Sequence, residues 1–105
     1  MSKKANIDEL THILAKALRH RIGSIVNQEE LYAKQYAKDA DTLTLEAQKV
    51  AMREHWNQDD KRHIGEMLRK KLNAELQKKD FLPEKKFDLV DGEIHKALQG
   101  LNMVP

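Results

Sequence analysis

Histidine and carboxylate spacing is the first feature of this chain that could support metal or acid–base chemistry. Glu9 precedes His12 by three residues, and Asp60 precedes His63 by the same interval. Glu-x-x-His motifs hold di-iron centres when two helices turn these ligands into the core of a bundle. At roughly 100° per residue, Glu9 and His12 instead lie nearly opposite the apolar stripe that begins at Ile7. We therefore expect surface histidines, with no metal centre and no cofactor.

Nucleophilic catalysis finds no support among the other reactive residues. Ser2 lies in an expected N-terminal tail and Ser24 in an expected turn, and no base is placed beside either serine. The four glycines form no loop that could cradle a phosphate group. The sequence thus predicts a protein that is not an enzyme.

Arg21 is the one charged residue that projects close to an apolar stripe. A buried guanidinium needs an acidic partner, and Glu46 or Glu54 on the following helix could supply it. Alternatively the side chain reaches solvent at the end of its helix. A third interpretation makes Arg21 a contact for an anion bound between helices. We keep Arg21 as the candidate anion contact.

Composition limits the size of the core and the choice of partners. The chain has 105 residues, of which 40% are hydrophobic and 34% are charged, and we expect a single domain over residues 1–105. Many of the hydrophobic residues are alanines, so the core is lean and burial against a second copy or another protein is an open possibility. The 19 basic and 17 acidic residues nearly balance, which gives little support to nucleic-acid binding.

The compartment is also constrained by the sequence. There is no cysteine, which excludes disulfides and cysteine zinc sites. No apolar run approaches the roughly 18 residues of a membrane span, and the basic N-terminus lacks the apolar stretch of a secretory signal. We expect a cytoplasmic protein that makes no membrane contact.

Three asparagines carry a helix-start signature. Each is followed at the third position by an acidic residue: Asn6 by Glu9, Asn27 by Glu30, and Asn57 by Asp60. An asparagine side chain can accept a hydrogen bond from a free backbone N–H, and the acid suits the positive end of the helix dipole. The pattern predicts helices that start after each of the three asparagines.

The apolar spacing completes an all-α prediction. We expect a flexible tail at 1–5, a helix over 7–22 that Gly23 caps, and a long helix from Asn27 to Trp56. A third helix spans 58–79, residues 80–90 form an irregular connection that packs back on the bundle, and a short helix spans 91–99. The predicted architecture is an antiparallel bundle of three to four helices, with the long helix at its centre and the short helix at its C-terminus.

The long helix carries a row of small residues at a 3.5-residue repeat. We call this row the seam; its members are Ala33, Ala37, Ala40, Thr44, Ala47 and Ala51. Small side chains allow another helix to approach closely along such a row. The residues at 39–42 have poor helix propensity, but the seam keeps its phase through them, which favours one unbroken helix.

Two further rows lie on the same helix. A bulky row beside the seam is expected to be ordinary core: Tyr32, Tyr36, Leu43 and Val50. A weaker row on the opposite side forms a candidate second contact face: Leu45, Met52 and Trp56. Apolar contact on more than one side is typical of a helix in the middle of a bundle.

The functional hypothesis is a non-catalytic module that binds another protein or a second copy of itself, as an adaptor, regulator or accessory protein. Self-association would use the seam as its interface. The alternative for the seam is that the other helices of the same chain cover it. The alternative function is a nucleic-acid-binding regulator that uses the scattered Lys and Arg residues of the first and third helices.

Overall fold

The chain folds into helices that are joined by short connections. The computed structural model describes residues 2–27 and 29–105, and these contain four α-helices, one 3₁₀ helix and no strand. In chain order the elements are α1 (Lys3–Val26), α2 (Glu30–Ala51), α3 (Gln58–Gln77), η1 (Glu84–Leu89) and α4 (Val90–Gly100). The prediction of an all-α protein is confirmed.

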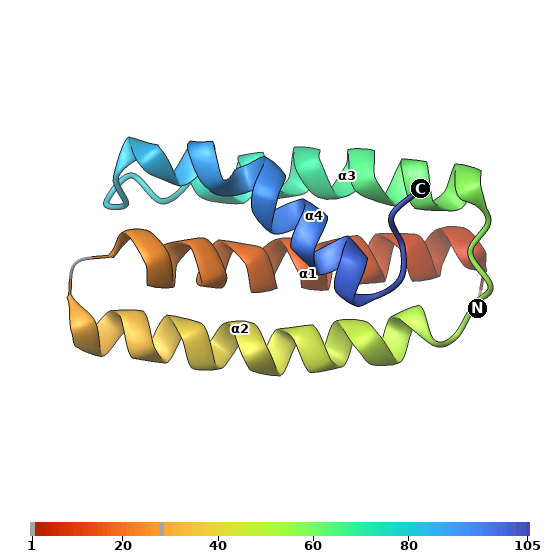
Figure 1. Cartoon of the computed structure of the whole chain (residues 1–105), viewed down its shortest axis with the longest axis horizontal. Coiled ribbons are helices and arrows are strands. Elements are labelled where there is room, and N and C mark those ends of the chain that lie inside the picture. Colours follow the sequence, from red (N-terminus) through yellow and green to blue (C-terminus); the bar gives the residue numbers. More distant parts are fainter. Residues whose placement is uncertain (1, 28) are drawn as a thin grey trace.

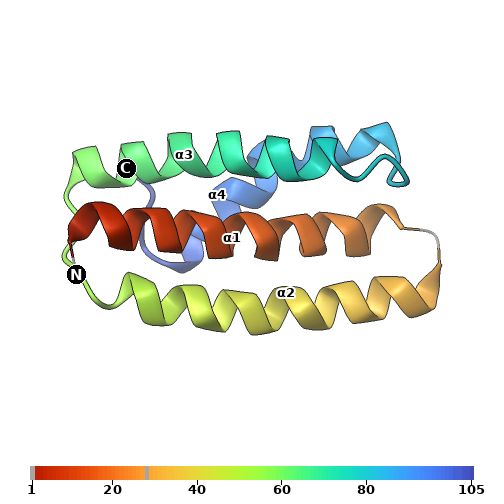
Figure 2. The same cartoon turned by 180° about the vertical axis from the view of Figure 1, so that it is seen from behind.

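The centre of the bundle is α1. It lies between α2 and α3, and α4 crosses one of its faces (Figures 1 and 2). Within the described residues, α2 contacts α1 and no other helix. The prediction that the helix from Asn27 to Trp56 is central is therefore wrong, and that helix is also shorter than expected.

The reason for this arrangement is the width of the apolar arc on α1. Eleven of its residues are buried, compared with three of α2, which are Ala40, Ala47 and Val50. Leu10, Leu14 and Leu18 form an apolar stripe, and the buried Ala15 and Ala17 lie beside it. Because these alanines widen the apolar surface, α1 can pack against neighbours on several sides. The long helix 30–51 has a single buried side and lies at the edge.

The directions of the helices decide which helix termini meet at each end of the bundle. In both views α2 runs opposite to α1, whereas α3 runs beside α1 in the same direction (Figures 1 and 2). The N-termini of α1 and α3 therefore share one end of the bundle. The α1–α2 connection and the loop after α3 share the other end.

The start of α1 differs from the prediction. The Ser2 hydroxyl accepts a hydrogen bond from the Ala5 N–H at 3.1 Å, so the helix begins at Lys3. Residues 3–5, which were expected in a flexible tail, are helical, and Met1 lies outside the described residues. Asn6 is buried inside α1 rather than capping it, and its side-chain amide donates to Glu54 at 3.1 Å and accepts from Arg53 at 3.3 Å.

Gly23 lies within α1 and does not end it. A Cβ atom at this position would lie 3.0 Å from Cδ2 of Tyr36. The glycine therefore permits the Tyr36 ring to pack directly on the backbone of α1. The helix continues to Val26, and Asn27 follows as its C-terminal cap.

The boundaries of α2 are set by side-chain contacts at both ends. The Asn27 side-chain oxygen accepts from the Glu29 N–H at 2.9 Å, so this asparagine shapes the connection while the helix starts at Glu30. The helix is unbroken through residues 39–42, as predicted. The Trp56 indole N–H donates to the Ala51 carbonyl at 2.8 Å, which caps the helix end and places Trp56 beyond it.

The start of α3 follows the prediction. Asn57 and Asp60 form a reciprocal capping box, with the Asp60 N–H donating to the Asn57 side chain at 2.7 Å. Ile64, Leu68 and Leu72 then face the core at four-residue steps.

The connection at 80–90 is more regular than expected, since η1 occupies 84–89. Leu82 and Val90 are buried, so most of the segment does pack on the bundle, whereas Phe81 is exposed. The buried Lys86 ammonium donates to the Lys79 carbonyl at 2.7 Å and lies 5.1 Å from the centre of the Phe87 ring. The Lys79 carbonyl also accepts from the Leu82 N–H at 3.0 Å, so the two hydrogen bonds hold the loop that follows α3 in place.

Candidate functional site

The seam of α2 faces α1 of the same chain. Ala40 is 1% exposed and Ala47 is fully buried, while the other four members are half-buried: Ala33, Ala37, Thr44 and Ala51. Because α1 is the neighbour that α2 contacts, the close approach that the small side chains permit is made within one chain. The sequence did not decide whether the chain's own helices or another molecule would cover the seam.

The candidate second contact face does not form one surface. Leu45 and Met52 lie opposite the seam and are exposed, Met52 at 85%. Trp56 lies past the end of α2 and packs against the core. Lys38 and Lys49 share the exposed side with Leu45, which makes this side a mixture of apolar and basic groups.

Arg21 has an acidic partner, but not one of the two that the sequence suggested. Its guanidinium pairs with Asp41 of α2, whereas Glu54 accepts from Asn6. Asp41 belongs to the segment with poor helix propensity, so that segment supplies a contact between α1 and α2. The pairing offsets the charge that an anion at Arg21 would use.

The residues with metal-ligand spacing are held by other contacts. Glu9 pairs with Arg53 at 2.6 Å, and Asp60 pairs with Lys3 at 2.9 Å. The hydrogen bonds from Lys3 and from the Asn57 N–H lower the pKa of Asp60. Across residues 2–27 and 29–105, no three His, Cys, Asp or Glu side chains are grouped to hold a metal ion.

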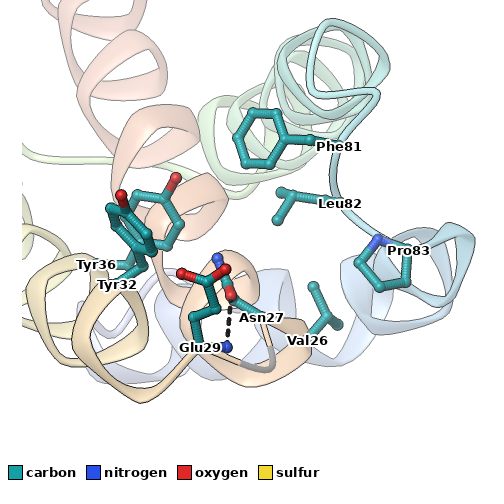
Figure 3. Close-up of a pocket in the computed structure, with 8 residues that line it drawn as sticks. All are labelled: Val26, Asn27, Glu29, Tyr32, Tyr36, Phe81, Leu82 and Pro83. Atoms are coloured by element: carbon teal, nitrogen blue, oxygen red, sulfur yellow. Dashed lines mark hydrogen bonds between the residues drawn. The ribbon is translucent and has the colours of Figure 1, made fainter.

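A groove lies at the loop end of the bundle, outside these contacts. It has a volume of about 670 Å³ and lies where the α1–α2 connection approaches the loop after α3. We call it the aromatic groove; it is lined by Val26, Asn27, Glu29, Tyr32, Tyr36, Phe81, Leu82 and Pro83. Figure 3 shows the two tyrosines of α2 across from Phe81 and Leu82.

The walls of the aromatic groove combine one fixed and one exposed aromatic residue on α2. Tyr36 packs over Gly23 and lies edge-on to the His20 ring, with 5.7 Å between the ring centres. Tyr32, one turn earlier, is 55% exposed, and Phe81 on the opposite wall is 65% exposed. The prediction that Tyr32 belongs to an ordinary core row is therefore wrong.

The charges around the aromatic groove are mixed. Arg19, His20 and Lys79 lie along one flank, and Glu29 lies in the lining. His20 contacts the Lys16 carbonyl through Nδ1 at 2.7 Å, and its Nε2 lies 3.8 Å from the Asp39 carboxylate. Both ring nitrogens of His20 thus face groups of this chain.

No local pattern in the sequence indicates this groove. Phe81 and Tyr32 lie far apart in the chain, and only the observed course of the two connections brings them to the same end. A signal was present in Phe81 and Leu82 before Pro83, because the residue before a proline is kept out of the helical conformation, so this segment must lie in a connection.

Comparison of the chain with protein-family models, curated proteins and solved structures found no significant match. None of the described helices combines the length and apolar character that a membrane span requires.

Proposed function

We propose that this protein is a non-catalytic helical interaction module whose aromatic groove receives an apolar segment of a partner protein. The observation that carries the proposal is the pair of exposed aromatic side chains, Tyr32 and Phe81, on opposite walls of one groove. Large contiguous apolar patches are uncommon on monomeric proteins and mark interaction sites, and the two rings line one groove with Leu82 and Pro83. Aromatic residues also dominate the binding energy of protein interfaces.

The burial of the seam supports the groove as the contact surface. Ala40 and Ala47 already pack against α1, so a partner helix at the seam would first have to displace α1. Phe81 needs no such rearrangement. If a second copy is the partner, the proposal places the contact at the groove end of each copy.

The ion pairs give less support to the nucleic-acid alternative. Every arginine of the chain lies within ion-pair distance of a carboxylate: Arg19 of Glu75, Arg21 of Asp41, Arg53 of Glu9, Arg62 of Asp59, and Arg69 of Asp91. A phosphate backbone would have to compete for these guanidinium groups and would be left with lysines as its free contacts. We therefore propose a protein partner.

Site-specific photocrosslinking tests the proposal. The photoreactive residue p-benzoylphenylalanine replaces Tyr32 or Phe81 in the native host, and replaces Met52 in a matched control that is exposed on the other side of α2. We expect one defined protein to be crosslinked from positions 32 and 81 but not from position 52. The purified partner should then bind the wild-type protein and lose at least tenfold in affinity for Phe81→Ser.

Three outcomes decide the question. A crosslink to a second copy, with a molecular mass that doubles with concentration in light scattering, identifies self-association. A crosslink to nucleic acid would favour the alternative function. Equal crosslinking from position 52, or none from positions 32 and 81, would contradict the proposal.

A further inference from the structure

A second groove lies at the opposite end of the bundle. It runs between α1 and α3 and has a volume of about 560 Å³. Its apolar base is formed by Ile7 and Met67, and its borders by Lys3, Lys4, Asp8, His63 and Lys70. We call it the basic groove. Because α1 and α3 run in the same direction (Figure 2), the first turns of α1, with Lys3 and Lys4, lie beside the part of α3 that carries Met67 and Lys70.

The lining of the basic groove carries three ammonium groups, those of Lys3, Lys4 and Lys70, against the one carboxylate of Asp8. Among the described residues, Lys4 and Lys70 form no ion pair, whereas Lys3 pairs with Asp60 at 2.9 Å. Next to the groove, the Lys71 ammonium donates to the Asp8 carbonyl at 3.1 Å and to the Thr11 hydroxyl at 2.7 Å. These partners are neutral, so the charge of Lys71 is not compensated by a carboxylate.

The base of the groove is apolar. Ile7 is buried and Met67 is partly buried against the core. Methionine adapts its shape to different contacts and is common at surfaces that bind helices. The groove therefore has an apolar strip with ammonium groups at its edges.

The complement of this strip is an amphipathic segment with apolar side chains in a row and carboxylates beside them. Binding of an amphipathic helix between two helices is a recurrent mode of peptide recognition. A nucleic-acid backbone would use the ammonium groups and leave Ile7 and Met67 without a contact. The apolar strip thus favours an acidic helix over a nucleic acid.

We propose that the basic groove binds an acidic amphipathic helix of a partner protein. This surface is separate from the aromatic groove and does not depend on it, so the module would hold two partners at its two ends. The attraction between the ammonium groups and the carboxylates gives the preference for an acidic helix, and it weakens as the salt concentration rises.

Fluorescence anisotropy with designed peptides tests the proposal on the whole chain. The probe is a labelled peptide with leucines at helical spacing flanked by glutamates. Its charge-reversed twin carries lysines in place of the glutamates, and a third peptide carries serines in place of the leucines. We expect the acidic amphipathic peptide to bind at least tenfold more tightly than either control, with an affinity that falls as salt is added.

Variants locate the binding on the protein. Lys4→Gln combined with Lys70→Gln should weaken the acidic peptide at least fivefold, whereas Lys38→Gln combined with Lys49→Gln on α2 serves as the matched control and should have little effect. Chemical shifts of backbone amides should change beside Ile7 and Met67 when the peptide is added. Thermal melting of each variant establishes that it is folded.

Several results would overturn the inference. Equal binding of the charge-reversed twin would remove the role of the lysines. Equal binding of the serine peptide, or of a short DNA duplex of mixed sequence, would show a surface for polyanions in general. Shifts confined to the aromatic groove would place the peptide at the other end of the bundle.

Discussion

The two longest helices of the protein differ in what they contribute, although their lengths are similar. α1 has 24 residues and α2 has 22, yet α1 is packed on several sides and α2 on one. The difference shows that the width of the apolar arc, rather than helix length or a regular repeat, decides which helix becomes central. It also separates two tasks, because α1 forms the core while α2 leaves most of its surface to solvent or to a partner.

The largest effect is expected from truncation of a leucine on α1. Leu14→Ala should lower the free energy of unfolding by about 2–5 kcal/mol, because it opens a cavity in the middle of the bundle. Urea denaturation measures the change. The matched variant Leu45→Ala on the exposed side of α2 should change it by less than about 0.5 kcal/mol, and equal losses would break the distinction between the helices.

A smaller effect is expected where α2 meets α1. Ala40→Leu adds volume to a contact that has no space for it, which should cost about 1–3 kcal/mol. The melting temperature and denaturation midpoint report the loss. Lys38→Leu adds a similar side chain on the exposed side and should leave both nearly unchanged. A stable Ala40→Leu variant would mean that the seam is not packed against α1.

The contact between Lys3 and Asp60 should make stability depend on pH. Because the pKa of Asp60 is lower in the folded state than its usual 3.8, the carboxylate stabilises the fold above that value, and this contribution is lost as the pH falls through the lowered pKa. Asp60→Asn should therefore lower the denaturation midpoint at neutral pH. In acid, the difference in midpoint between the variant and the wild type should disappear. Asp59→Asn is the control at the neighbouring position. A difference in midpoint between Asp60→Asn and the wild type that persists in acid would contradict a role for the Asp60 carboxylate in the pH dependence.

The smallest effect on folding is expected from Phe81→Ser. The ring is mostly exposed, so its removal should change the free energy of unfolding by less than about 0.5 kcal/mol. Differential scanning calorimetry measures this change. A loss of unfolding free energy comparable to that of Leu14→Ala would show that Phe81 stabilises the fold. It would then no longer support a role of the exposed ring in partner binding.

The sequence could predict the helices because their apolar spacing and capping chemistry are local. The capping box of Asn57 and Asp60 and the unbroken helix through 39–42 both follow from residues within a few positions of one another. Asn6 and Asn27 carry the same signature as Asn57, but Ser2 and Glu29 occupy the cap positions. The signature alone does not tell whether an asparagine side chain is turned toward its own backbone or toward another helix.

The candidate site could not be predicted in the same way because it depends on neighbours far apart in the chain. The seam on α2 was visible in the sequence, but its cover by α1 depended on tertiary packing. The aromatic groove combines Tyr32 with Phe81, and the basic groove combines Lys4 with Lys70. No local pattern pairs such residues until the direction of each helix is known.

Amide hydrogen exchange of the native protein tests the central claim most directly, since it compares the stability of α1 and α2 residue by residue. Amides in the middle of α1, from Leu10 to Ile22, should open only with global unfolding and exchange most slowly. Amides in the middle of α2, from Ala40 to Ala47, should exchange faster, because α2 packs on one side only. Slower exchange in α2 than in α1 would contradict an α1-centred fold with an α2 edge left for recognition.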